Sequence, residues 1–212
     1  MALEDIYQAV LDYEEDDVAE LVQAEIDAGT DVKAILDEGL IKALDVIGDN
    51  FTAGTIFVPE MLMAAEAMQA GLDILRPLLI KTGNEPAGTV ILGTVKGDLH
   101  DIGKNLVGMM LEGAGFRMID LGTDVDPETF ITAAQENNAD VIGLSGLLTT
   151  SMPEIENTVA VIQDANKNRN LNVKVMVGGP PVNQTFADNI GADAYGMDAP
   201  GAVEKARAFI SA

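Results

Sequence analysis

Apolar residues recur every three or four positions from the start of the chain to about residue 83, the spacing that places them on one face of an α-helix. The first helix carries Leu3, Ile6, Val10 and Leu11, and the second carries Val18, Leu21, Val22 and Ile26. Gly29 is typical of a residue that ends a helix, and Asp31 can cap the helix that follows. The pattern predicts that the chain begins with two amphipathic helices.

Two further helices follow in this part of the chain. A third apolar segment runs through Leu40, Leu44 and Ile47 to Phe51. Pro59 suits the first turn of a long fourth helix, whose apolar positions are Met61, Leu62, Ala65, Met68, Leu72 and Leu75. Four helices with short connections predict an antiparallel bundle over residues 1–83. Glycine, asparagine and proline in residues 81–88 then predict a linker.

From Thr89 onward the pattern changes to short apolar runs that alternate with helical segments. The expected strands are 90–92, 116–121, 141–144, 173–177 and 192–195, and the expected helices begin near Ile102, Pro127, Pro153, Pro181 and Pro200. Strands that alternate with helices of this length form a parallel sheet covered on both faces. Residues 89–212 are therefore predicted to form a doubly wound α/β domain with about five strands.

Parallel sheets of this kind bind ligands outside the carboxyl ends of their strands. Residues 98–103 follow the first expected strand, and residues 145–151 follow the third. Residues 178–180 and 196–198 follow the fourth and fifth. The segments that suggest chemistry are therefore expected to meet at one edge of the sheet.

The charge balance limits the classes of partner. The chain has 12 Lys and Arg against 35 Asp and Glu, a net charge of −23, which argues against a nucleic acid or an anionic membrane. The acidic surplus is expected to be a solvated surface, or alternatively to steer docking onto a basic protein. Cysteine is absent, which excludes thiolate metal ligands and fits a reducing cytosol. The first residues lack the order of a signal peptide, and no apolar stretch approaches the roughly 18 residues that span a bilayer, so a cytoplasmic protein is expected.

His100 is the single histidine of the chain, and Asp98 stands two residues before it. A carboxylate in this place can accept the proton of one ring nitrogen and leave the other nitrogen to bind a metal. The alternative is an ordinary half-buried histidine. Because there is no cysteine and no second histidine, a metal bound by His100 would take its other ligands from a macrocycle or from oxygen atoms.

The neighbours of His100 have competing interpretations. Asp98 orients the imidazole, or it is a loop carboxylate in solvent. Asp101 precedes a helix expected at Ile102, and a helix cap is the favoured interpretation. Gly103 allows a flat ligand to approach the start of that helix, or it allows tight packing of helix against strand.

Small residues follow the third and fourth expected strands. Ser145, Thr149 and Ser151, with Leu147 between them, line a narrow polar slot or are ordinary loop and cap residues. The pair 178–179 is a glycine turn, or it leaves room for a ring system against the backbone. Together they predict a deep cleft that suits a long ligand tail.

These residues resemble a known signature. The segments Asp98-Leu99-His100-Asp101-Ile102-Gly103, Ser145-Gly146-Leu147 and Gly178-Gly179 are similar to the D-x-H-x-x-G, S-x-L and G-G motifs of cobalamin-binding domains. The helical half, including residues 54–61, resembles the cap domain of the methyl-transferring branch. The resemblance is closest to the small corrinoid proteins of methanogens and acetogens, and extends to the matching module of cobalamin-dependent methionine synthase.

The resemblance implies a helical cap domain over residues 1–83 and a flavodoxin-like cobalamin-binding domain over residues 89–212. It implies that His100 replaces the nucleotide base beneath the cobalt of methylcobalamin or a related corrinoid, the base-off, His-on mode, with Asp98 and Ser151 as a relay behind it. The further cofactor contacts that it implies are Leu99, Asp101, Ile102 and Gly103 near the imidazole, and Ser145, Leu147, Thr149, Ser151, Gly178 and Gly179 around the nucleotide tail. It also implies that Phe51, Val58 and Met61 pack over the upper face of the corrin. The alternative for these residues, and for Met63 and Met68, is that they belong to the core of the helical bundle.

The function implied is a methyl carrier that is not an enzyme alone. It would accept a methyl group from a substrate through one partner methyltransferase and deliver it to a thiol or tetrahydrofolate through a second, with residues 81–88 as a hinge and a reductive activase as a further partner. Methanol, methylamines, betaines and methoxylated aromatics are all open as donors. The alternatives are a cobalamin-dependent regulator, the cobalamin subunit of a radical mutase, and a receiver-like signalling domain.

Overall fold

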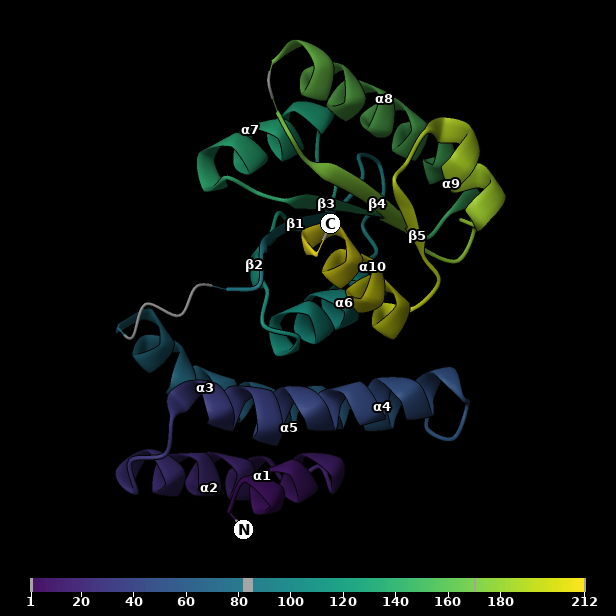
Figure 1. The fold of residues 1–212 in the computed structure, drawn as a ribbon. Helices are drawn as coiled ribbons and strands as arrows, with labels where there is room; N and C mark the ends of the chain where they lie inside the picture. Colours follow the sequence, from purple (N-terminus) through teal and green to yellow (C-terminus); the bar gives the residue numbers. More distant parts are fainter. Residues whose placement is uncertain (1, 82–85, 170, 212) are drawn as a thin grey trace. The chain divides into compact units, whose positions relative to one another are not determined.

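The computed structural model describes residues 2–81, 86–169 and 171–211. These residues divide into two compact units (Figure 1), one formed by residues 1–86 with 112–115, the other by residues 87–111 with 116–212. Of the predicted linker 81–88, residues 82–85 lie outside the described part of the chain.

The first unit is helical, as predicted. Its described elements are α1 (Ala2–Leu11), α2 (Glu15–Asp27), α3 (Val32–Ala34), η1 (Ile35–Ile41), α4 (Lys42–Thr52) and α5 (Val58–Lys81). Gly29 follows α2 with a φ of +81°, and the Asp31 carboxylate accepts a hydrogen bond from the backbone N–H of Ala34 at 3.0 Å. Both boundaries therefore lie where the glycine and the capping aspartate predict them.

The third helical segment is not a regular α-helix, because its middle, η1, is a π-helix. Regular helical spacing predicts no such turn. The wider turn brings residues four and five positions apart onto one side, and Ile35, Gly39 and Leu40 are all buried. A Cβ atom on Gly39 would lie 3.0 Å from the side chain of Ile6, so the glycine lets η1 approach α1 closely.

The second unit contains a single parallel sheet, which confirms the predicted fold class. Its strands are β1 (Thr89–Thr94), β2 (Arg117–Asp120), β3 (Val141–Ser145), β4 (Lys174–Gly178) and β5 (Ala194–Gly196), in the order β2-β1-β3-β4-β5. The helices between them are α6 (Ile102–Gly113), α7 (Pro127–Asn137), α8 (Met152–Asn168), α9 (Gln184–Ile190) and α10 (Ala199–Ile210). Figure 1 shows α7 and α8 over one face of the sheet and α6 and α10 over the other.

One helix begins three residues after the proline that predicts it, and another begins near its proline but follows a 3-10 turn. The helix expected near Pro181 begins at Gln184, because the side chain of Asn183 accepts a hydrogen bond from the N–H of Phe186 and so caps it there. The helix expected near Pro153 begins at Met152 and follows a 3-10 turn, η2 (Thr149–Ser151).

The strand order reverses between β1 and β3, which marks the point at the carboxyl edge where sheets of this kind bind ligands. The chain passes from β1 to β2 in one direction and from β3 to β4 in the other, so the order reverses between β1 and β3. Loops leave in opposite directions at such a point and expose the crevice between them. Of the helices in the described residues, none is both long and apolar enough to cross a membrane.

Candidate functional site

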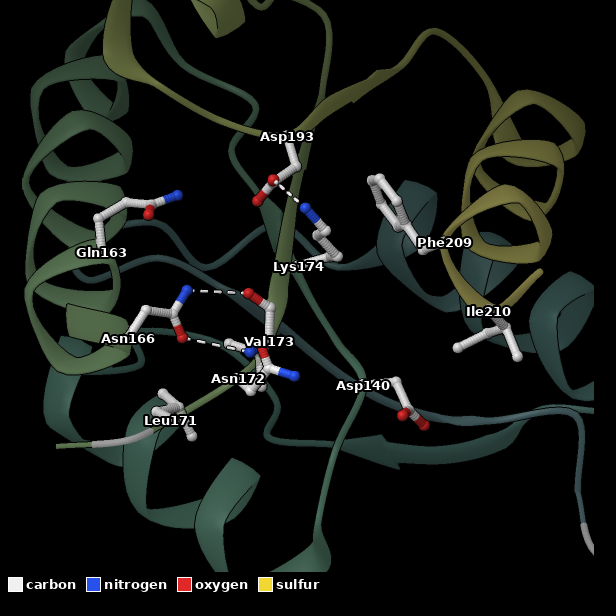
Figure 2. A pocket seen from close by; sticks show the side chains of 10 residues that line it. All are labelled: Asp140, Gln163, Asn166, Leu171, Asn172, Val173, Lys174, Asp193, Phe209 and Ile210. Atoms are coloured by element: carbon white, nitrogen blue, oxygen red, sulfur yellow. Dashed lines mark hydrogen bonds and ion pairs between the residues drawn. The ribbon is translucent and has the colours of Figure 1, made fainter. Parts of the chain in front are cut away.

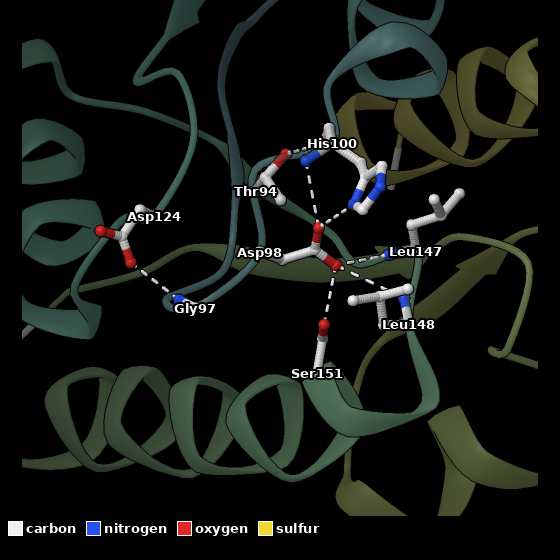
Figure 3. Close-up of polar contacts among 8 residues, drawn as sticks. All are labelled: Thr94, Gly97, Asp98, His100, Asp124, Leu147, Leu148 and Ser151. Carbon is white, nitrogen blue, oxygen red and sulfur yellow. Dashed lines mark hydrogen bonds and ion pairs between the residues drawn. The ribbon is translucent and has the colours of Figure 1, made fainter.

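The loop after β1 presents an imidazole on a buried carboxylate. The side chain of Asp98 is fully buried, whereas that of His100 is 51% exposed, and His100 Nδ1 lies 2.7 Å from Asp98 Oδ1. The same oxygen accepts the backbone N–H of His100 at 3.1 Å. Figure 3 shows the carboxylate facing the ring from below. An ionised carboxylate requires a proton on Nδ1, so Nε2 is the ring nitrogen that can donate to a metal.

The second oxygen of Asp98 joins this loop to the loop after β3. Asp98 Oδ2 accepts the hydroxyl of Ser151 at 2.7 Å and the N–H groups of Leu147 and Leu148 at 2.8 and 3.4 Å. Asp98 and Ser151 are therefore in direct contact across the point where the strand order reverses. Leu148 was not expected from the sequence, because its contribution is a backbone N–H that any residue could supply.

These hydrogen bonds control the charge of Asp98. Burial raises the pKa of its carboxyl group, but hydrogen bonds from Ser151, His100 and Leu147 outweigh burial and hold the pKa well below its ordinary value. The group is therefore a carboxylate at neutral pH. A negative charge behind the ring strengthens the donation of its far nitrogen to a metal.

Several apolar side chains in the loops at the carboxyl edge are exposed to solvent. Leu99 and Ile102, neighbours of His100 along the chain, are 72% and 77% exposed, and Met197 after β5 is 69% exposed. A Cβ atom on Gly103 would meet nothing within 4 Å. Gly103 is therefore not required for packing against the strand, which favours the alternative in which it leaves space for a ligand.

The glycine pair after β4 brings two backbones together. Gly179 has a φ of +126°, and a Cβ atom there would lie 2.0 Å from the carbonyl oxygen of Gly146. The N–H of Gly146 donates to the carbonyl of Gly178 at 3.3 Å, and Ser145 pairs with Gly178 in the sheet register. These residues therefore meet at the ends of β3 and β4, and Gly179 tolerates no side chain.

The remaining predicted residues have different environments. Leu147 is 40% exposed, Thr149 is exposed in η2, and Asp101 is exposed at the start of α6, where its carbonyl accepts the N–H of Asn105 at 2.7 Å. In the helical unit, Val58 is 41% exposed and Phe51 is half-buried, whereas Met61 and Met68 are buried. Burial favours the bundle-core alternative for Met61 and Met68, while Met63 is 43% exposed.

Two polar residues of the site were not expected. The hydroxyl of Thr94 donates to the carbonyl of His100 at 2.9 Å, and Asp124 Oδ1 accepts the N–H of Gly97 at 2.7 Å. Thr94 ends β1, and Asp124 follows β2. Every loop that follows a strand of a parallel sheet lies at the carboxyl edge, so the place of Asp124 after the second expected strand was a signal that could have found it.

The amino edge of the sheet has a hollow of about 370 Å³ that the sequence did not indicate (Figure 2). Its polar groups bond to one another: the side chain of Asn166 donates to the carbonyl of Val173 at 2.9 Å and accepts its N–H at 3.2 Å, and Lys174 Nζ lies 3.0 Å from Asp193 Oδ1. These polar groups at the strand ends are therefore already paired within the protein.

The carboxyl edge fits a cofactor that brings most of its own metal ligands. Within residues 2–81, 86–169 and 171–211, no group of three or more His, Cys, Asp and Glu side chains is placed to hold a metal ion. One oriented imidazole, exposed apolar neighbours and a close glycine contact are nevertheless present. They would suit a metal held in a macrocycle, with His100 as the residue that could donate a nitrogen to it.

Comparison with known proteins gives matches along both units. Two family models match, each described as a B12 binding domain, one over residues 88–204 and the other over residues 2–76. A corrinoid protein of Desulfitobacterium hafniense is 44% identical over 211 residues, which are 98% of this chain and 97% of the relative. Trimethylamine corrinoid protein 1 of Methanosarcina acetivorans is 39% identical over 204 residues, 95% of this chain and 94% of the relative.

A solved structure resembles the chain over almost its whole length. A chain from the methanol:cobalamin methyltransferase complex of Methanosarcina barkeri matches with a TM-score of 0.84 and 32% identity. The match covers 99% of this chain and 80% of that chain.

Proposed function

The chain belongs to the corrinoid protein family, and on that premise we propose that it carries a methyl group on cobalamin between two partner methyltransferases. The observation that carries the proposal is the exposed imidazole of His100 held by the buried carboxylate of Asp98. When bound, cobalamin supplies a cobalt atom that accepts and releases methyl groups. The chain supplies the surface that binds and orients this group.

His100 is the proposed axial ligand, in the base-off, His-on mode. Its Nδ1 is occupied by Asp98, so the ring presents Nε2 toward solvent in a fixed tautomer. The hydrogen bond from the Ser151 hydroxyl helps to lower the pKa of Asp98. Ser151 therefore acts on the imidazole indirectly, through Asp98.

The residues proposed to contact the cofactor around the imidazole are exposed to solvent, so a bound ligand could reach them. Leu99 and Ile102 offer exposed apolar surface, with Asp101 and Gly103 beside them, and the small residues at the ends of β3 and β4 are proposed to receive the nucleotide tail. That second group consists of Ser145, Leu147, Thr149, Ser151, Gly178 and Gly179. On the helical unit we propose Phe51 and Val58 as cap residues.

The division of the chain into a helical cap domain over residues 1–83 and a cobalamin-binding domain over residues 89–212 stays a prediction, as does the hinge at residues 81–88. We further propose a cytoplasmic location. One partner is a methyltransferase that selects the methylated substrate, and the second transfers the methyl group to a thiol or to tetrahydrofolate. Relatives named for trimethylamine and dimethylamine make methylamines the first donors to test.

Substitution of His100 by alanine tests the proposal. The cobalt(II) form should show splitting from one protein nitrogen by electron paramagnetic resonance, and labelling with nitrogen-15 histidine changes one residue because His100 is the single histidine. We expect His100→Ala to lose this splitting and to bind hydroxocobalamin about tenfold more weakly or worse. The untagged protein must be used, since a histidine tag would add labelled nitrogens.

Gln135→Ala, at an exposed position within α7, is the matched control and should behave as wild type. A wild-type spectrum that is unchanged by the label would contradict the ligand role of His100. The carrier role is tested separately, by supplying candidate methylated donors with the copurified methyltransferase and measuring the demethylated product.

A further inference from the structure

The His100 loop has neighbours on both sides, because β1 lies between β2 and β3 in the sheet. On the β3 side, the contacts run through the side chain of Asp98 to Leu147 and Ser151. On the β2 side, the contacts come from the loop that joins β2 to α7. Figure 3 shows Asp124, from that loop, on the opposite side of Asp98 from Leu147.

Asp124 binds the main chain next to Asp98 at two points. Its carboxylate oxygen Oδ1 accepts the N–H of Gly97 at 2.7 Å, and its own N–H donates to the carbonyl of Asp98 at 3.0 Å. The N–H of Thr94 donates to the carbonyl of Gly122 at 3.0 Å. The N–H of Val125 donates to the carbonyl of Thr94 at 3.1 Å, so the pairing of β1 with its neighbour continues beyond the end of β2 and includes the bridge between Val95 and Val125, next to Asp124.

The backbone of Asp124 is in an uncommon conformation. Its φ is +56°, in the left-handed region that aspartate and asparagine tolerate better than other non-glycine residues. Gly97, its partner, has a φ of +79°. Such a conformation persists where the surrounding contacts favour it, and here they are the two bonds to residues 97 and 98.

A buried carboxylate can orient an imidazole only if its own main chain is held. The side-chain bonds of Asp98 lead toward His100 and the β3 side, and its N–H donates to the carbonyl of Val95 at 3.2 Å within the same loop. Asp124 fixes residues 97 and 98 from the β2 side, and the Thr94 hydroxyl fixes the carbonyl of His100. We infer that Asp124 is a positioning residue that sets the direction in which His100 presents Nε2. The inference rests on the proposed function, in which that nitrogen binds cobalt.

Three variants separate the side chain from the backbone. Asp124→Gly keeps a positive φ without strain and removes the carboxylate that binds Gly97. Asp124→Asn keeps an oxygen that can accept the Gly97 N–H and a residue that tolerates a positive φ, so it should retain most of the wild-type behaviour. Asn138→Gly is the matched control, because Asn138 is also exposed, has a φ of +49° and ends α7 away from this loop.

The first measurement needs no cofactor. Hydrogen exchange of the Gly97 amide in the cobalamin-free protein should be about tenfold faster in Asp124→Gly than in wild type. Asp124→Asn should lie close to wild type, and Asn138→Gly should leave the Gly97 amide unchanged. Unfolding by urea in parallel measures any general loss of stability.

The second measurement uses hydroxocobalamin. We expect Asp124→Gly to bind it about fivefold to tenfold more weakly, and a smaller fraction of its cobalt(II) form to show the histidine nitrogen splitting. A purely structural role would lower the unfolding midpoint without changing that fraction. If Asp124→Gly shows the wild-type nitrogen splitting, whether or not its Gly97 amide exchanges faster, the inference about Asp124 is wrong and the proposed function is unaffected. Absence of the labelled-nitrogen effect in wild type overturns the proposed ligand, and the inference with it.

Discussion

Both edges of the sheet use aspartates to bind backbone N–H groups, but the two edges do so in different surroundings. At the amino edge, Asp140 accepts the N–H of Thr89 at 2.8 Å, and Asp193 accepts that of Val175 at 2.9 Å. At the carboxyl edge, Asp98 accepts hydrogen bonds from His100, Leu147, Leu148 and Ser151. Asp140 is exposed, whereas Asp98 is 1% exposed.

The difference lies in what each carboxylate holds. The amino-edge aspartates bind N–H groups at the ends of strands, and Asp193 also pairs with the Nζ of Lys174. The carboxyl-edge aspartate is enclosed by donors from two loops and holds a side chain that is itself half in solvent. The buried charge of Asp98 therefore has two roles, because it joins two loops through hydrogen bonds and also orients the imidazole. This contrast supports the proposal that the carboxyl edge is the functional edge of the sheet.

The largest expected effect comes from removing the charge of Asp98. Both oxygens of Asp98 accept hydrogen bonds, so in Asp98→Asn the NH₂ group must face a donor whichever way the amide is turned. We expect the free energy of unfolding to fall by about 3 kcal/mol. Asp140→Asn, the matched change at the amino edge, can keep its bond to the N–H of Thr89 and should cost about 0.5 kcal/mol. Urea unfolding followed by circular dichroism measures both. Equal losses would show that the two edges do not differ as described.

Ser151→Ala should have an intermediate effect. It removes one buried donor to Asp98 and leaves four others, so we expect a loss of about 1 kcal/mol together with weaker cobalamin binding. The control is Ser211→Ala, which removes an exposed hydroxyl that donates to the carbonyl of Arg207. The same urea titration compares them, and a larger loss in the control would contradict the importance of burial.

The smallest effect is expected on changing pH. The pKa of Asp98 is lower in the folded chain than in the unfolded chain, so its contribution to stability is complete above the unfolded value, about 4, and is lost as pH falls below it. The stability difference between wild type and Asp98→Asn should therefore be constant from pH 7 to pH 5 and narrow toward pH 3. A difference that widens on acidification would show that the folded pKa is raised instead.

Local sequence was sufficient for most of the elements and for the contact between His100 and Asp98. Helical spacing in residues 1–83 and apolar runs after Thr89 depend on neighbours a few positions apart, so periodicity found both. His100 and Asp98 are two residues apart, and their contact is a local one that their spacing already allows. The π-helical turn of η1 was not found, because it depends on how Gly39 meets Ile6 in another helix.

What the tertiary structure alone decided is which loops flank the imidazole. The sequence orders the strands from one to five, but the sheet places β1 between β2 and β3, and this brings Ser151 to one side of Asp98 and Asp124 to the other. Burial likewise separated Met61 in the bundle core from the exposed Val58 three residues earlier. Periodicity is fixed by nearest neighbours along the chain, whereas strand order and burial are fixed by packing between segments far apart in it.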